Sequence, residues 1–262
     1  MESGIVSEDY LTLQYEMMEA QQKIKVNIEK NIELEIIEEE LNFEKPVLPQ
    51  LKQVPIPLPL FHEALLQIAH VLIEQNTLIE NKLIDTLKQL KKEELVNWIK
   101  SSIMFDTEFF QSFSVKNDLE AWVPHFVAEQ ALRPFLHVVS EKCTTIIHKF
   151  DVMGTCPCCG EPPRLGKVDE GENKLLTCPR CETDWNQKKN ACVHCGEDRE
   201  GMLIYLGMEE DDSILLEVCK TCRNYLKLVE KEKDKKKSAA LIDLETLPLD
   251  FVAQEEGYGD SN

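Results

Sequence analysis

The chain has 262 residues, 48 acidic against 29 basic side chains, and a formal net charge of −19. Its composition, 43% hydrophobic and 29% charged, is typical of globular proteins, and its length allows one to three modest domains. No stretch approaches the ~18 apolar residues of a membrane helix, and the N-terminus lacks a basic region before an apolar run. The sequence therefore predicts a soluble, cytoplasmic protein without membrane insertion. The charge disfavours nucleic-acid binding, because phosphate contacts need clustered Lys and Arg.

The first half of the chain is predicted to be α-helical. Residues 1–50 are acidic with loose helical spacing, which indicates one or two helices. In the proline-rich segment 54–60 the chain is expected to be extended until Pro59 opens a helix. From Leu60 onward, apolar residues recur at helical intervals in four stripes, over residues 60–73, 79–90, 93–103 and 119–148.

Several side chains of this half are assigned to its interior. The expected core anchors are Trp98, Trp122, Phe126 and Phe135. Cys143 lies on an apolar helical face and is interpreted as a small buried hydrophobe. Isolated histidines on such helices are usually core or surface residues, so no functional role is assigned to them.

The composition changes after residue 151. Cysteine, glycine and proline increase, and the helical period stops until residues 225–237, which are predicted to form a charged helix. The tail over residues 241–253 is too apolar for a free end, and we expect it to dock on the body of the protein or on a partner.

Eight of the ten cysteines form four C-x-x-C pairs. The pairs are Cys156/Cys159, Cys178/Cys181, Cys192/Cys195 and Cys219/Cys222. In a reducing compartment, pairs with this spacing indicate metal ligands or redox motifs before disulfides.

The cysteine pairs also show an internal duplication. The first and third are followed by Gly-Glu, and the second and fourth are preceded by Leu-Leu. The first and third pairs lie 36 residues apart and the second and fourth 41, which predicts a longer turn around residues 207–212 in the second copy. Each copy is therefore interpreted as a cysteine turn, a hairpin and a second cysteine turn. Pairing the first turn with the third and the second with the fourth is the less favoured alternative.

Each copy can supply four thiolates to one metal ion. Two thiolates three residues apart on a tight turn form half of a tetrahedral site, and Gly160 and Gly196 can adopt the positive φ that such a turn favours. Four thiolates suit zinc or a single iron, so two metal ions per chain are expected. Cys158 is interpreted as an extra sulfur at an exposed tip of the first turn, and His194 as a solvated side chain.

These motifs resemble those of the formate dehydrogenase accessory protein family, FdhE. The similarity lies in the order of the cysteine pairs, in Trp185 after the second pair, in Tyr225-Leu226-Lys227 after the fourth, and in the tail over residues 243–258. The resemblance implies an α+β fold: an α-helical domain (1–150), tandem rubredoxin-like or zinc-ribbon four-cysteine modules (151–227), and a C-terminal helix and docking tail (228–262).

The resemblance also implies a function. The chain would be a cytoplasmic assembly factor, not an enzyme, that binds the catalytic subunit of a molybdenum- or tungsten-dependent formate dehydrogenase. No catalytic residues are assigned, and a homodimer is compatible with the sequence. One alternative is a redox or sulfur-handling metalloprotein that uses a four-cysteine iron centre or Cys158. The other is a zinc-ribbon nucleic-acid binder, which is less favoured because residues 151–227 contain ten basic and fifteen acidic side chains.

Overall fold

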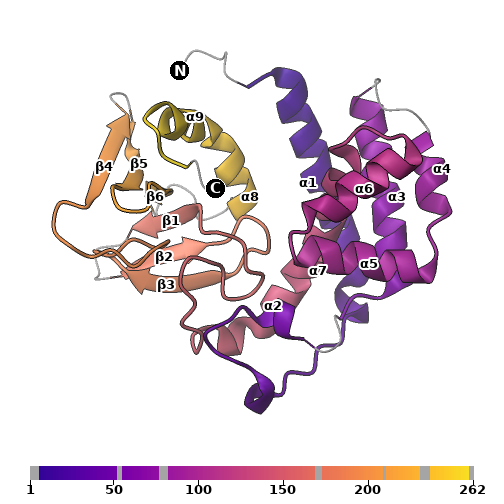
Figure 1. The fold of residues 1–262 in the computed structure, drawn as a ribbon, viewed down its shortest axis with the longest axis horizontal. Helices are drawn as coiled ribbons and strands as arrows, with labels where there is room; N and C mark the ends of the chain where they lie inside the picture. The colour runs from indigo at the N-terminus through magenta and orange to yellow at the C-terminus, as the bar shows by residue number, and fades with distance from the viewer. Residues whose placement is uncertain are drawn as a thin grey trace. The chain divides into compact units, whose positions relative to one another are not determined.

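The structure is a computed structural model, and it describes residues 6–51, 55–76, 82–168, 173–208, 211–230 and 237–259. Its helices are α1 (Glu8–Ile28), α2 (Val47–Gln50), α3 (Leu58–Gln75), α4 (Lys82–Lys88), α5 (Lys92–Ile103), α6 (Thr107–Asn117), α7 (Val123–Ile147), α8 (Ala239–Glu245) and α9 (Leu247–Glu255). Short 3-10 turns cover Glu29–Asn31 and Glu38–Glu40. Its strands are β1 (Leu165–Val168), β2 (Asn173–Thr177), β3 (Asp184–Lys188), β4 (Leu203–Met208), β5 (Asp211–Cys219) and β6 (Tyr225–Glu230). This composition confirms the predicted α+β class (Figure 1).

The chain divides into two compact units, one of residues 1–36 and 51–139 and the other of residues 37–50 and 140–262. Helix α7 begins in the first unit and ends in the second. The domain boundaries at residues 150 and 227 were placed at changes in composition. That the three segments are separate domains stays a prediction.

In the part that the structure describes, the regular elements of the first unit are helices, and aromatic side chains fill much of its interior. Trp98 is fully buried, and the rings of Phe110 and Phe113 meet it edge-on at 5.4 and 5.0 Å. Phe61 and Phe135, also fully buried, make a second edge-to-face pair at 6.0 Å. Trp98 and Phe135 are thus core residues, as predicted.

The prediction for Trp122 was wrong, because this side chain is 45% exposed. It precedes α7 and stacks edge-on against Phe126, which is only half-buried. The two rings therefore cover one another near the start of the helix instead of filling the interior.

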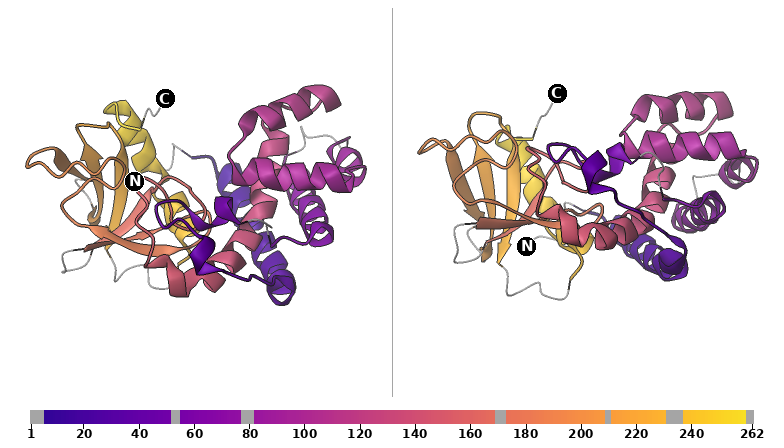
Figure 2. Two further views of the ribbon diagram at one scale, coloured as in Figure 1. Left: turned by 60° about the horizontal axis from the view of Figure 1, so that its bottom comes forward. Right: turned by 90° about the horizontal axis from the view of Figure 1, so that it is seen from below.

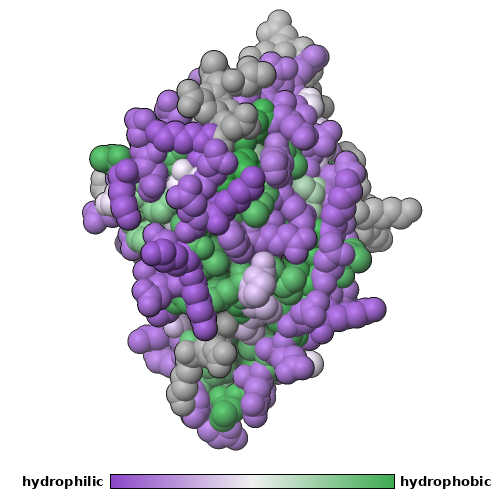
Figure 3. Space-filling model, turned by 90° about the vertical axis from the view of Figure 1, so that its right-hand side faces the viewer, coloured by the Kyte–Doolittle hydropathy of each residue, from purple (hydrophilic) through white to green (hydrophobic). Residues whose placement is uncertain are grey.

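Figure 3 looks onto the side on which α4, α5 and α6 lie in Figure 1, and shows hydrophobic groups scattered among mostly hydrophilic ones.

The second unit is built on a six-stranded sheet with the order β3-β2-β1-β6-β5-β4. β1, β2 and β3 form one antiparallel meander, β4, β5 and β6 form another, and β1 and β6 join them as a parallel pair. Each copy of the predicted duplication thus supplies three neighbouring strands, in the same order across the sheet. The two copies form one continuous sheet.

The predicted charged helix over residues 225–237 was wrong for Tyr225–Glu230, which is strand β6. β6 lies between β1 and β5, so its backbone groups are paired on both sides. The buried run from Leu226 to Val229 suits a strand that is covered on both faces. The charged stretch 231–236 suggested a helix, but it lies outside the described residues.

The C-terminal tail docks on the sheet of its own unit, as one of the two expected outcomes. Leu249 and Ala253 of α9 pack with Leu216 and Val218 of β5. Ala239 and Ile242 of α8 pack with Leu165 of β1 and Val229 of β6. Figures 1 and 2 show both helices, in yellow, against one face of the sheet.

Residues 37–50 contact the first cysteine turn and the segment that precedes it. The backbone N–H groups of Val47 and Leu48 donate to the carbonyls of Pro157 and Cys158, both at 2.9 Å. The Asp151 N–H donates to the Phe43 carbonyl, and the Phe43 ring meets that of Phe150 edge-on at 5.0 Å. Part of the acidic segment that the sequence predicted to be helical therefore contributes directly to the cysteine unit.

Two candidate metal centres

All four C-x-x-C pairs lie on turns with the same backbone hydrogen bonds. In the first turn the Gly160 N–H donates to the Cys156 carbonyl, and the Cys156 N–H donates to the Glu161 carbonyl. The third turn repeats this pattern with Gly196, Cys192 and Glu197. Equivalent bonds close the second turn from Cys178 to Thr183 and the fourth from Cys219 to Asn224. Each turn therefore presents its two sulfurs on the same side.

The residue after each pair has a positive φ. Gly160 and Gly196 have φ values of 84° and 75°, as the sequence predicted. Glu182 and Arg223 occupy the same position in the second and fourth turns with φ of 60°. The sequence analysis missed these two, because non-glycine residues rarely adopt this conformation. Their backbone strain of about 1–3 kcal/mol each must be offset by the interactions that close the turn.

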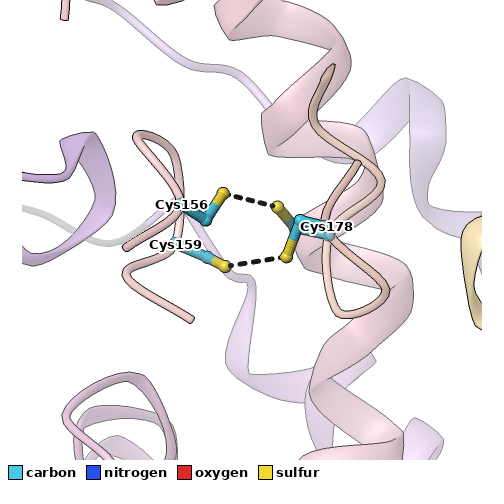
Figure 4. Close-up of side chains that lie close together, drawn as sticks. Cys156, Cys159 and Cys178 are labelled. Carbon is cyan, nitrogen blue, oxygen red and sulfur yellow. Dashed lines mark hydrogen bonds between the residues drawn. The ribbon is translucent and has the colours of Figure 1, made fainter. Parts of the chain in front are cut away.

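The first two turns bring their sulfurs together in the first cluster, which we define as Cys156, Cys159, Cys178 and Cys181. The Cys156 and Cys181 Sγ atoms are 3.6 Å apart, as are those of Cys159 and Cys178. Figure 4 shows the side chains from the two turns pointing toward one another. A tetrahedral zinc with Zn–S bonds of about 2.3 Å would separate its sulfurs by about 3.8 Å. The four thiols are therefore spaced to hold one metal ion.

The last two turns form the second cluster, which consists of Cys192, Cys195, Cys219 and Cys222. Its closest sulfur pairs are 3.7 and 3.8 Å apart. In each cluster all four sulfurs lie within 4.8 Å of one another. The pairing is thus tandem, first turn with second and third with fourth, and the alternative pairing across the two copies was wrong.

The two clusters differ in exposure. Every cysteine of the first cluster is buried, whereas Cys195 is exposed and Cys222 is half-buried in the second. Burial raises the pKa of Cys156 and Cys181 well above the usual range of a thiol. In the second cluster burial also opposes ionisation of Cys219, but N–H donors from Cys222 and Thr221 lower its pKa. A bound cation is the group that would hold the buried thiols as thiolates.

A hydroxyl pair that the sequence analysis missed supports the first cluster. The Thr183 Oγ1 lies 3.1 Å from the Cys181 sulfur and 2.6 Å from the Ser140 Oγ. With Cys181 as a thiolate, Thr183 can donate to the sulfur while it accepts from Ser140. Thr183 follows its cysteine by two residues and could have been noticed, but Ser140 lies 43 residues away on α7.

The prediction that Cys158 is an exposed tip sulfur was wrong. Its side chain is 1% exposed, and the backbone of this part of the turn accepts hydrogen bonds from Val47 and Leu48. A hydrogen bond with Cys143 raises the pKa of Cys158, and burial raises it further. Cys143 is itself fully buried, as predicted.

The prediction of a solvated His194 was also wrong. Its side chain is half-buried, and Nε2 lies 2.9 Å from the Tyr225 carbonyl oxygen at the start of β6. Burial lowers the pKa of this imidazole. His194 therefore links the third turn to the strand that follows the fourth.

A buried ion pair joins the two halves of the sheet. Lys174 of β2 and Glu217 of β5 are 1% and 3% exposed, and the Lys174 Nζ lies 2.5 Å from the Glu217 Oε1. Lys174 also donates to the Ala191 carbonyl at 3.0 Å, directly before the third turn. Breaking such a pair would leave an uncompensated buried charge, which costs about 3–5 kcal/mol. The two modules are therefore coupled by charge as well as by the β1–β6 pairing.

Within the described part of the chain, no helix is both long and apolar enough to cross a membrane.

Known proteins resemble this chain along different parts of its length. The family model described as "FdhE, C-terminal domain" matches residues 191–262. An FdhE homolog from Aquifex aeolicus is 26% identical over 214 residues, which cover 80% of this chain and 71% of that protein. FdhE of Escherichia coli is 35% identical over 111 residues, which cover 41% of this chain and 35% of that protein. An FdhE homolog from Pseudomonas aeruginosa is 34% identical over 113 residues, 39% of this chain and 36% of its own length.

A solved structure shows that the fold extends over most of the chain. The crystal structure of the FdhE protein from Pseudomonas aeruginosa superposes with a TM-score of 0.59, at 20% sequence identity, over 94% of this chain and 91% of that one. The sequence matches and the tandem cysteine turns agree with this likeness in fold. The chain is therefore similar to FdhE proteins in its C-terminal sequence and in its overall fold.

Proposed function

We propose that this protein is a non-enzymatic assembly factor for a molybdenum- or tungsten-dependent formate dehydrogenase. It would bind the catalytic subunit in the cytoplasm and would be needed for formation of the active enzyme. The similarity to FdhE proteins and the resemblance of the cysteine turns and tail support this role. The observation that carries the proposal is the pair of four-thiol clusters on one continuous sheet, with the tail docked on it.

Each cluster is proposed to bind one zinc or iron ion, giving two ions per chain. The proposed ligands are Cys156, Cys159, Cys178 and Cys181 in the first cluster and Cys192, Cys195, Cys219 and Cys222 in the second. Four-thiolate sites leave no open coordination position for substrate, which is typical of structural metal sites. The ions would hold the turns together and so shape a binding surface, without reacting themselves.

The redox or sulfur-handling alternative depends on Cys158, and its surroundings weigh against it. A thiol that exchanges sulfur must reach its substrate and ionise readily. Cys158 is 1% exposed, and its pKa is raised by Cys143 and by burial. A buried thiol of this kind is suited to packing beside the first cluster.

The experiment combines capture with metal analysis. Tagged protein purified anaerobically from the source cell should retain the catalytic subunit of formate dehydrogenase and contain two metal ions per chain. Cys178→Ser should lower the metal content to about one ion and abolish formate dehydrogenase activity in the cell. Cys158→Ala is the matched control, and it should keep both ions and the activity.

Two results would contradict the proposal. Wild-type protein that is fully loaded with only one ion per chain would refute the tandem sites. A Cys158→Ala protein with both ions, a normal fold and no formate dehydrogenase activity in the cell would favour the sulfur-handling alternative.

The mass of the purified protein in solution would distinguish a monomer from the homodimer that the sequence allows.

A further inference from the structure

A pocket of about 350 Å³ lies within the second unit, between the end of α7 and strands β2 and β3. Its size is at the lower end of the range for small-ligand sites. The α7 side supplies Glu141, His148 and the nearby Phe150, and the strand side supplies Glu182, Asp184 and Trp185. Neither the metal clusters nor the docked tail uses this pocket.

The charge of the pocket is one-sided. Three of its lining residues, Glu141, Glu182 and Asp184, carry carboxylates, and none is a Lys or Arg. Asp184 is exposed, and its Oδ1 accepts a hydrogen bond from the Thr177 hydroxyl at 2.6 Å, which orients the carboxylate. Because opposite charge favours binding, this lining suits a cationic ligand and disfavours phosphates and carboxylates.

The rest of the lining combines aromatic and apolar side chains with uncharged polar ones and His148. Trp185, which is 8% exposed, lines the pocket together with Phe150 and Leu175. A guanidinium group is planar, stacks on aromatic faces and can bind a carboxylate through two parallel hydrogen bonds. A compact ammonium group offers neither the plane nor the fork. The combination of walls and carboxylates therefore suits an arginine side chain better than lysine.

Two lining residues connect the pocket to the first cluster. Ser140 and Thr183 line it, and Thr183 also lies 3.1 Å from the Cys181 sulfur. The turn that carries Cys178 and Cys181 thus shapes one side of the pocket. An occupant would contact the hydrogen-bonded hydroxyls that orient this ligand.

We propose that this pocket binds an arginine side chain of a partner polypeptide. This deepens the proposed function, because the pocket gives one specific anchoring point for a partner next to the first cluster. Binding of a guanidinium group to this pocket can be tested in the absence of formate dehydrogenase. A failure here would therefore leave the assembly role standing, and a failure of the assembly role would leave this site testable.

The test is a titration of the full-length, metal-loaded protein with a capped Gly-Arg-Gly peptide, followed by NMR of backbone amides and tryptophan indoles. The expected result is saturable shifts at Trp185, Thr183 and Asp184. The matching citrulline peptide, which has nearly the same shape without the charge, should bind at least about tenfold more weakly, as expected when a charge-assisted hydrogen bond is lost.

Variants locate the site. Asp184→Asn retains an oxygen for Thr177 but removes the charge, and Asp184→Asn with Glu141→Gln should weaken peptide binding about tenfold or more. Glu200→Gln changes an exposed acidic residue outside the pocket and is the matched control, which should bind as the wild type does. Metal content and the unperturbed spectrum of each variant would verify its fold.

Several outcomes would overturn the proposal. The first is equal affinity for the arginine and citrulline peptides, and the second is a higher affinity for a Gly-Lys-Gly peptide than for the arginine peptide. The third is a double variant, Asp184→Asn with Glu141→Gln, that shows the same peptide-induced shifts as the wild type. Calcium or magnesium causing the same shifts at lower concentrations than the peptide would identify a divalent-cation site instead.

Discussion

Lys227 is the charged residue on which docking of the tail depends most directly. Its side chain is fully buried in β6, and its Nζ lies 2.9 Å from Asp250 Oδ2 and 2.6 Å from Asp243 Oδ1. Asp250 also accepts a 2.7 Å hydrogen bond from the Tyr225 hydroxyl. One carboxylate of α9 therefore satisfies two groups of the sheet.

Asp250→Ala should detach α8 and α9. The substitution leaves a buried ammonium with one carboxylate and a phenol without its acceptor, and breaking a buried ion pair costs about 3–5 kcal/mol. Glu245→Ala is the matched control, because Glu245 pairs with Lys237 at 2.5 Å while both side chains are about two-fifths exposed. Surface pairs of this kind contribute about 0–1 kcal/mol.

Hydrogen exchange of residues 239–259 measures the opening of the tail. At 1.4 kcal/mol per factor of ten, Asp250→Ala should speed exchange there by about two to three and a half powers of ten, and Glu245→Ala by less than about tenfold. Adding Lys227→Met removes the stranded charge and should restore part of the protection. If Asp250→Ala behaves like Glu245→Ala, or if Lys227→Met gives no recovery, the buried charge does not hold the tail.

Three further predictions concern the second unit. Removing metal with a chelator should unfold the strands and cysteine turns but keep most of the helical circular dichroism, since structural zinc contributes on the order of 10 kcal/mol to small domains; loss of both signals together would contradict this. Gly259→Ala should speed proteolysis of the tail far more than its control, Gly201→Ala. Both glycines have positive φ, but a Cβ at residue 259 would lie 2.5 Å from the Tyr225 ring, whereas a Cβ at residue 201 would meet nothing within 4 Å. Burial and the Asp250 carboxylate raise the pKa of Tyr225, so its contribution to tail stability is present below about pH 10 and lost as the pH rises through the folded-state pKa. Tyr225→Phe should remove this alkaline loss in hydrogen exchange, and an unchanged pH profile would refute the assignment.

The local chemistry of the cysteine turns was readable from the sequence. A C-x-x-C pair places both sulfurs on one short turn, so the spacing alone indicated four half-sites, and the repeated flanking residues indicated the duplication. Gly160 and Gly196 marked positive φ because glycine accepts it at little cost. The apolar stripes likewise indicated α3, α4, α5 and α7, since a helical period reports on one buried face, but no stripe marked α6.

The tertiary structure decided which groups meet. Only the sheet shows that the turns pair in tandem, because both pairings use the same local geometry. Leu226–Val229 forms a strand because β1 and β5 pair with both of its edges. Cys158 is buried in a turn whose backbone is bonded to the distant residues Val47 and Leu48. The pocket beside Trp185 joins α7 to β2 and β3 across some 40 residues of sequence. Burial, strand pairing and pocket lining are all set by contacts between distant segments, and the pattern of any one segment does not contain them.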